Sequence, residues 1–460
     1  MNRMQSVNCH MCRFPHSLPV LLALFYILFM TPLMGRKNGY TVDATPSFQL
    51  TRMIVETGDW LPPEKVKQGY VYSLAYIPFY ALGQELDAWL PSPEPDWIPR
   101  KSLCWMNTVL TGLTVGLLAG VLGRLGYSPG ARVFVSLAYG LSTLAFAYAR
   151  YDYNKCLAAF LLLLAFDYAV AYLSEKNIGP LAGCGVAMGL LITVRLEMAV
   201  AGAAVFGAFV LTADGWAPRR KLALGFGVPV ALGIGWVLLY NRIYWGSDIS
   251  GGYEWNFQWN PLPALQGFFL SPGKNIWFYN PVLLLLPVAV RPFWQRHPAV
   301  SWMWLGTLAA LLAVYSFWEY WWGGWAWGPR HLVPLLPLAV IPLAAAVDSD
   351  SREFKLLLVI LAAAGLFIQF LGGYTDFNNI ILTLMNQGVT EMEMIWNPLW
   401  NPIVNHYRFL PYIPLWDWDY GWIGLYQFAP AFVFETLLIL WGGALAGLGF
   451  LIRRAVRGGE

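Results

Sequence analysis

Charged side chains are scarce in this chain. Asp, Glu, Lys and Arg make up 12% of its 460 residues, whereas a soluble domain carries about 25%. Hydrophobic residues make up 58% of the sequence, which is more than a soluble core of this size could bury. We therefore expect an all-α, polytopic membrane protein. The net charge of +3 is too small to indicate a nucleic-acid partner.

Cysteine and histidine are also few. Three of the five cysteines lie in or at the edge of apolar segments, so no disulfide framework is predicted. Cys9 and Cys12 flank His10, but haem attachment needs the order Cys-x-x-Cys-His, and we interpret this stretch as a cytosolic tail. No His/Cys cluster lies in the outer loops, and the inner loops hold no Gly-rich phosphate loop of the Walker type. The sequence therefore predicts no cofactor and no nucleotide site, and it leaves a divalent metal possible but without support.

Long apolar runs dominate what is present. A helix needs about 20 apolar residues to cross the hydrocarbon core of a bilayer, and we predict about twelve such segments, with both termini on one side. They are residues 17–34, 102–123, 130–148, 155–173, 181–195, 198–212, 222–240, 276–290, 299–317, 331–347, 356–373 and 428–451. The first segment ends in a poor cleavage site, so we expect an uncleaved anchor rather than a signal peptide.

The apolar stretch 181–212 decides the topology. As one helix it would run about 48 Å, which is too long for a core of about 30 Å. A break at Arg195-Leu196-Glu197 gives two short segments instead. Only the broken version keeps Arg219, Arg220 and Lys221 on the inner side, as the positive-inside rule requires.

This topology sorts the loops and the domains. The outer face collects 35–101, 149–155, 241–275, 318–330 and 374–427. In the first outer loop, 45–57 and 70–83 are predicted to be interfacial helices rather than spans, because Thr45-Pro46 is a helix start signal and Pro78 interrupts a short, wet segment. The domains are a cytosolic tail (1–16), the membrane domain (17–452, with the first outer loop 35–101) and a second cytosolic tail (453–460).

Two outer-face carboxylates could carry chemistry. Asp43 follows the first span by about nine residues, and Asp152 lies in a very short turn between two spans. A carboxylate at a membrane surface is suited to general-base work or to positioning a hydroxyl. The alternatives are a solvated loop acid for Asp43 and local pairing with Arg150 or Lys155 for Asp152.

The last outer stretch before residue 331 combines a cation with many aromatic rings. Arg330 follows Gly328-Pro329, and a guanidinium fits a phosphate better than an ammonium does. The alternative is an interfacial anchor or an ordinary aromatic belt. The remaining candidates are Lys67 and Lys274 for phosphate, and Trp322, Trp325 and Trp327 for stacking on sugar and lipid.

On these residues the chain resembles the integral-membrane glycosyltransferases of the GT-C fold, which use polyprenyl-phosphate sugars. The similarity is to the branch holding the protein O-mannosyltransferases and the lipid A aminoarabinose transferase. Asp43 and Asp152 match the two outer acids of that family. Gly328-Pro329-Arg330-His331 resembles its Gly-Pro-Arg-Tyr stretch, and Ser271-Pro272-Gly273-Lys274 resembles another. The chain departs where many relatives have Asp-Glu and it has Asp43-Ala44, and it lacks their C-terminal soluble domain, which leaves the acceptor open.

The resemblance implies an inverting glycosyltransferase in the bacterial inner membrane, with an extracytoplasmic site. Asp43 would deprotonate the acceptor hydroxyl and Asp152 would position it. Arg330, with Lys67 or Lys274, would hold the phosphate of a polyprenyl-phosphate sugar donor. The acceptor would be a lipid, a glycan or a protein.

Two other interpretations stay open. A transporter or lipid flippase would need charged groups in a mid-membrane cavity, and the candidates for such groups are Asp167, Arg195, Glu197 and Glu435. A non-catalytic GT-C-like subunit is the other alternative, because Ala44 replaces an acidic residue.

Overall fold

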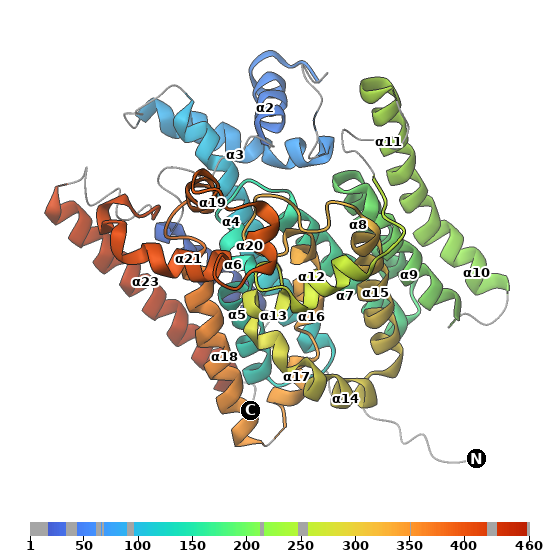
Figure 1. Ribbon diagram of the computed structural model, residues 1–460. Coiled ribbons are helices and arrows are strands. Elements are labelled where there is room, and N and C mark those ends of the chain that lie inside the picture. The colour runs from blue at the N-terminus through green and yellow to red at the C-terminus, as the bar shows by residue number, and fades with distance from the viewer. Residues whose placement is uncertain are drawn as a thin grey trace.

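Helices make up most of the described chain (Figure 1). The computed structural model describes residues 17–33, 44–60, 66, 69–89, 96–211, 216–246, 256–349, 351–420 and 430–457. Within these ranges, extended pairing is limited to a single antiparallel bridge between Phe257 and Trp318. The predicted all-α class is therefore confirmed.

Six helical stretches in the described ranges are long and apolar enough to cross a membrane. They are α4 (Trp97–Arg124), α7 (Lys155–Glu175), the stretch Arg219–Trp245, α15 (Pro298–Phe317), α18 (Arg352–Leu371) and α23 (Ala431–Arg457). The stretch Arg219–Trp245 runs through α10 (Trp216–Leu222), one π-helical turn (Ala223–Gly227) and α11 (Val228–Trp245). Each of the twelve predicted ranges falls on helical structure, but several are short or interrupted.

Shorter apolar helices fill the remaining predicted spans. They are α1 (Ser17–Met30), α5 (Pro129–Ser142), α6 (Leu144–Tyr148), α8 (Ile178–Val194), α9 (Ala199–Leu211), α13 (Ile276–Tyr279), α14 (Leu286–Arg296), α16 (Leu336–Ala339) and α17 (Leu343–Val347). Proline accounts for the interruptions near the sites of interest: Pro281 opens a 3-10 turn before α14, and Pro334 lies inside the 3-10 turn before α16. Proline cannot donate a helical hydrogen bond, so the backbone changes its winding there.

The break predicted in 181–212 is confirmed. Arg195 has an extended backbone (φ −151°, ψ 107°), and Leu196–Met198 form a 3-10 turn before α9 begins. With 17 residues, α8 is about 26 Å long, which is close to the thickness of the hydrocarbon core.

The two ranges predicted to be interfacial are helical, as α2 (Thr45–Thr57) and α3 (Tyr70–Trp89), at the top of Figure 1. The helix α3 extends beyond the predicted end at residue 83. The helix α2 has proline in its first turn and ends at Gly58, whose φ of +71° favours glycine. Phe48 of α2 packs 5.5 Å from the ring of Tyr80 in α3. Further short helices stand in the later outer loops: α12 (Leu262–Leu270), α19 (Phe377–Asn386), α20 (Glu391–Trp396) and α21 (Pro402–Phe409).

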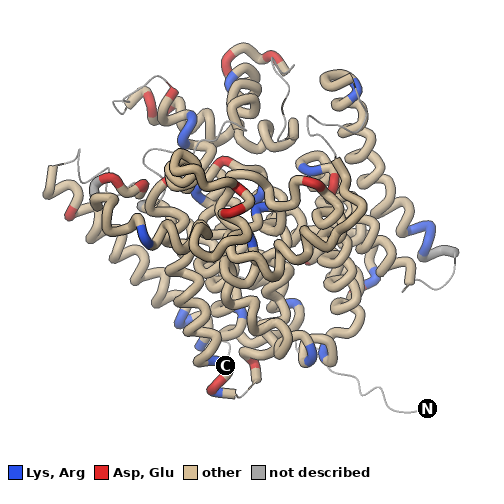
Figure 2. Tube along the Cα trace, in the orientation of Figure 1, with Lys and Arg blue, Asp and Glu red and all other residues tan. Residues whose placement is uncertain are grey.

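Charge marks the two ends of the bundle. Figure 2 shows Lys and Arg gathered at the lower ends of α14, α18 and α23, whereas most acidic residues lie in the upper half, around α2, α3 and the later outer loops. The basic end is therefore the inner end by the positive-inside rule. The helix α23 continues to Arg457, past the predicted domain boundary at residue 452.

Candidate functional site

The outer turn that carries Asp152 is fixed by two neighbouring helices. From α4, Asn107 Nδ2 donates to the carbonyl oxygen of Tyr153 at 2.8 Å, and Thr108 Oγ1 donates to that of Ala149 at 2.9 Å. From α3, the hydroxyl of Tyr72 donates to the carbonyl oxygen of Asp152 at 2.9 Å. The Asp152 side chain is fully buried. The backbone of the turn is therefore fixed, and the Asp152 side chain is enclosed by the protein.

Arg150 supports this turn from the other side. Its guanidinium donates to the carbonyl oxygens of Leu33, Gly373 and Asp419 and lies 4.6 Å from the centre of the Tyr420 ring. These contacts tie the turn to the outer ends of α1 and α18. Arg150 therefore forms hydrogen bonds with backbone segments that are distant in the sequence. The sequence had suggested only a local ion pair with Asp152.

Lys101, which the sequence analysis did not select, faces the same region. The residue is 7% exposed, and among the described residues its ammonium has no hydrogen-bond partner. Burial raises the pKa of Asp376, the charge of Asp419 raises it further, and the charge of Lys101 opposes this rise. A buried cation therefore lies near several carboxyl groups at the outer end of α4.

The aromatic loop (residues 318–329) is anchored by Lys274. The ammonium donates to the carbonyl oxygens of Gly324, Ala326 and Gly328 at 3.0, 2.9 and 3.3 Å. Three N–H donors are all that an ammonium has. Lys274 was predicted from the sequence to bind the donor phosphate. In this structure all three of its N–H donors instead bond to carbonyl oxygens of the aromatic loop.

Arg330 lies where the aromatic loop meets the carboxylate-bearing turn. Its guanidinium carbon is 5.7 Å from the centre of the Tyr153 ring, next to Asp152 in the chain. The loop closes on it at Gly323, where φ is +75° and a Cβ would stand 2.6 Å from Arg330 Cγ. Glycine is required at this position both for its backbone conformation and for the close approach. Arg330 and Asp152 are thus brought to one face of the molecule.

The three candidate tryptophans are in different environments. Trp325 is 39% exposed and Trp322 is half-buried, so both keep part of the side chain accessible, and their stacking role stays a prediction. Trp327 is buried, and its ring packs edge-on against Tyr279 and His406 at 5.2 and 4.6 Å. The structure therefore gives Trp327 a packing role in place of the predicted stacking role.

The break between α8 and α9 adds an ion pair that sequence reasoning placed with the transporter alternative. Arg195 and Glu197 pair with both side chains 8% exposed. Arg195 Nη1 also donates to Asn154 Oδ1 at 3.3 Å, and the Tyr315 hydroxyl donates to Glu197 at 3.3 Å. The sequence does contain a signal for Arg195 and Glu197, because these two charged residues interrupt an apolar run at a predicted helix break.

Two predicted residues lie outside the described ranges, namely Asp43 and Lys67. Of the others, the structure brings Asp152, Arg330 and Lys274 into one outer region through the turn and the aromatic loop, and it adds Arg195 and Lys101. Among the described residues, no group of three His, Cys, Asp or Glu side chains could hold a metal ion.

The chain is similar to one curated transferase and to solved structures of another, although no family model matches it. It is 24% identical over 358 residues to the undecaprenyl phosphate-alpha-4-amino-4-deoxy-L-arabinose arabinosyl transferase of Pseudomonas savastanoi pv. phaseolicola. This match takes in 72% of the chain and 61% of the relative, so the chain spans less than two thirds of that protein.

Two crystal structures of ArnT from Cupriavidus metallidurans are similar in fold, at 16% identity. The complex with undecaprenyl phosphate has a TM-score of 0.53, covering 96% of this chain and 73% of ArnT. The apo state has a TM-score of 0.52, covering 95% and 73%. The chain therefore has the fold of ArnT, and the GT-C fold predicted from the sequence resemblance is confirmed.

Proposed function

We propose that the protein transfers a sugar from a polyprenyl-phosphate donor to an acceptor hydroxyl at the extracytoplasmic surface of the membrane. The observation that carries this proposal is the meeting of Arg330 and Arg195 with the buried Asp152 turn. Guanidinium groups bind phosphate, and a fixed carboxylate suits a hydroxyl. The ArnT fold supports the same chemistry, because one ArnT structure holds undecaprenyl phosphate.

In the proposed reaction the acceptor oxygen attacks the anomeric carbon as the bond from that carbon to the phosphate oxygen breaks. Asp43 takes the hydroxyl proton, and Asp152 orients the acceptor. The departing polyprenyl phosphate carries the negative charge, which Arg330 stabilises, aided by Lys67. Attack opposite the leaving group inverts the anomeric configuration. Phosphate is a fair leaving group, so positioning and charge stabilisation supply most of the rate.

The partners follow from this chemistry. The donor is a polyprenyl-phosphate sugar, and the acceptor is a lipid, glycan or protein that reaches the outer surface of a bacterial inner membrane. The similar curated transferase is named for aminoarabinose on undecaprenyl phosphate, so a pentosyl donor of that kind is the first to test. No reaction step is assigned to a metal.

Three of the four charged residues that would have served a transporter form ion pairs. Asp167 pairs with Arg124 at 3.0 Å near the inner end of α4, and Arg195 pairs with Glu197 at the outer break. A transport cavity would need such groups at mid-membrane. Their positions support the enzyme over the transporter.

The test is a transfer assay on the purified full chain in nanodiscs. A panel of radiolabelled undecaprenyl-phosphate sugars, aminoarabinose first, is offered with a lipid extract, a glycan mixture and a peptide mixture. We expect label to move to one acceptor class and free undecaprenyl phosphate to accumulate in equal amount. Arg330→Ala protein serves as the control. Donor turnover that is equal with and without the wild-type protein across the whole panel would refute the proposal.

A further inference from the structure

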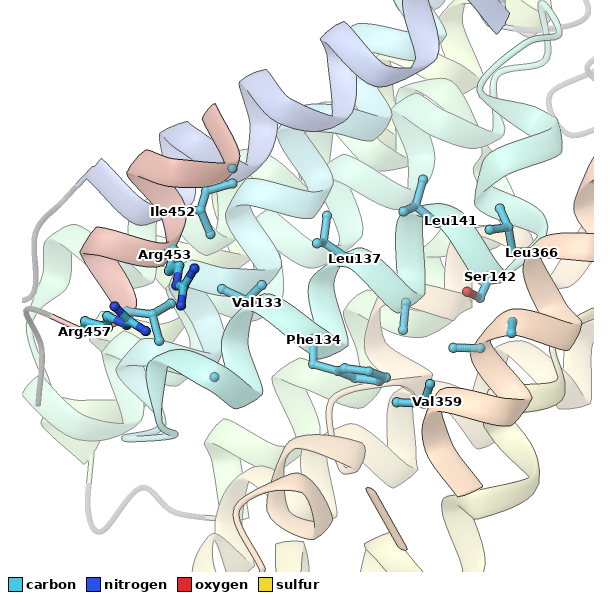
Figure 3. A pocket seen from close by; sticks show the side chains of 16 residues that line it. Val133, Phe134, Leu137, Leu141, Ser142, Val359, Leu366, Ile452, Arg453 and Arg457 are labelled. Carbon is cyan, nitrogen blue, oxygen red and sulfur yellow. The ribbon is translucent and has the colours of Figure 1, made fainter. Parts of the chain in front are cut away.

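An apolar groove runs along α5, between α18 and α23 (Figure 3). Its volume is about 820 Å³, and the helices α5, α18 and α23 form its walls. Apart from Ser142, the only polar residues among those that line it are two arginines on α23, Arg453 and Arg457. Figure 3 places these arginines at one end and Leu366 and Ser142 at the other.

Packing of the three helices explains the groove. Near the outer end of the groove, α18 approaches α5 closely because residue 365 is a glycine. A Cβ at this position would lie 2.4 Å from the carbonyl oxygen of Ser142. On the other side α23 is held to α1, where Trp441 Nε1 donates to the carbonyl oxygen of Leu28 at 2.8 Å. The helices α18 and α23 therefore flank α5 without filling the face between them.

The two ends of the groove differ in chemistry. Phe134 and Leu137 offer an apolar floor, and Val359, 51% exposed, forms a rim toward the lipid. Arg453 and Arg457 are exposed at the inner end of α23, and neither forms an ion pair within the described ranges. A long apolar channel that ends in two unneutralised guanidinium groups is complementary to a lipid with an acidic head group.

We propose that this groove binds a phospholipid of the inner leaflet that carries a net negative head group. One acyl chain lies along α5 from Phe134 to Ser142, and the phosphate lies between Arg453 and Arg457. The position of the charges favours an inner-leaflet phospholipid over the polyprenyl-phosphate donor. The two arginines are at the basic, inner end of the bundle, whereas the candidate phosphate site for the donor is at the outer end. This proposal does not depend on the proposed transfer reaction.

The experiment measures lipid binding to the delipidated full-length protein by native mass spectrometry. The probes are phosphatidylglycerol, which is anionic, phosphatidylethanolamine, which has no net charge, and undecaprenyl phosphate. We expect phosphatidylglycerol to bind at least about tenfold more tightly than phosphatidylethanolamine. The double variant Arg453→Gln/Arg457→Gln should lose that preference.

Two further variants separate charge from shape. Arg454→Gln removes a neighbouring exposed charge that does not line the groove, so it should bind phosphatidylglycerol as the wild type does. Ala362→Phe fills the apolar channel without changing charge and should weaken phosphatidylglycerol binding by about tenfold. Equal binding of both phospholipids, an unchanged preference in the double variant, or tighter binding of undecaprenyl phosphate at this groove would each overturn the proposal.

Discussion

The ammonium of Lys274 donates a hydrogen bond to the carbonyl oxygen of Ala326 at 2.9 Å, across more than fifty residues of chain. Together with its bonds to Gly324 and Gly328, this contact fixes the aromatic loop against the segment that precedes α13. Burial, and then the charge of Arg330, lower the pKa of Lys274 to about 7. The residue is therefore a positioning group for Trp325 and Arg330.

Replacing Lys274 should loosen the aromatic loop. In Lys274→Met two buried carbonyl oxygens, of Ala326 and Gly328, and the part-buried one of Gly324 lose their donor. Each buried loss costs about 1–3 kcal/mol. We expect a lower melting temperature, faster proteolysis within residues 318–329, and transfer activity reduced by at least about tenfold. Lys355→Met, at an exposed site on α18, is the control. Wild-type proteolysis and activity in Lys274→Met would exclude the anchoring role.

The two carboxylates should differ in the size of their effects. Asp43→Asn keeps the shape of the side chain but cannot accept a proton near neutral pH, so turnover should fall by about 10² to 10⁴ with donor binding retained. Turnover should fall less in Asp152→Asn, because Asp152 positions the acceptor. The KM for the acceptor should rise in this variant.

The control for this pair is Glu85→Gln, an exposed carboxyl on α3, which should have wild-type kinetics. Near-full turnover in Asp43→Asn with an inactive Asp152→Asn would assign the base to Asp152. Full turnover in both variants would contradict the mechanism.

The paired N–H donors of the Arg330 guanidinium should contribute to donor binding as well as its positive charge. Arg330→Lys keeps the positive charge but loses the paired donors that fit a phosphate. We expect weaker donor binding and about tenfold lower turnover, with a larger loss in Arg330→Ala. Donor affinity is measured by equilibrium binding and turnover by the transfer assay. Unchanged donor affinity in Arg330→Ala would leave Arg330 as an interfacial anchor.

His406 should make the outer region acid-sensitive. Burial lowers the pKa of His406 to about 4, and its Nδ1–H donates to the Pro402 carbonyl oxygen at 2.7 Å. The unfolded chain has a His pKa of about 6.5, so between about pH 6.5 and 4 the unfolded state binds more protons. Stability from this residue should therefore be complete above about pH 6.5 and fall as the pH drops toward 4.

The check is thermal unfolding in detergent from pH 4 to 8. His406→Asn retains a donor for Pro402 but does not titrate, and it loses the packing against Trp327. We expect a lower melting temperature at pH 8 and a shallower decline toward acid than in the wild type. An identical acid slope in both proteins would show that other groups control it.

Sidedness can be read by cysteine labelling. Asp152 is fully buried and unsuited to this purpose, whereas Trp259 and Tyr412 are 97% and 81% exposed. In intact cells, with Cys9 and Cys12 replaced by serine, Trp259→Cys and Tyr412→Cys should react with an impermeant thiol reagent. Arg352→Cys and Arg454→Cys should react only after permeabilisation. Labelling of Arg352→Cys from outside would show that residue 352 lies on the outer side, contrary to the predicted topology.

Several features were predictable because they depend on neighbouring residues in the chain. Thr45-Pro46 marks the start of α2, which begins at Thr45, since a proline in the first turn costs no hydrogen bond. The break at Arg195 followed from segment length and from the position of the basic loop at 219–221. The resemblance predicted the fold, but the chemical roles of Asp43, Asp152, Arg330 and Lys67 stay predictions.

The sequence by itself determined that this is a helical membrane protein with its inner end basic and its polar candidates at the outer end, because hydropathy and loop charge act locally along the chain. The tertiary structure decided which polar groups meet. Lys274 reaches a loop fifty residues away, Arg150 joins Leu33, Gly373 and Asp419, and Trp327 is enclosed by His406. Buried polar groups must find hydrogen-bond partners wherever packing puts them, and no local pattern records which distant segment supplies one.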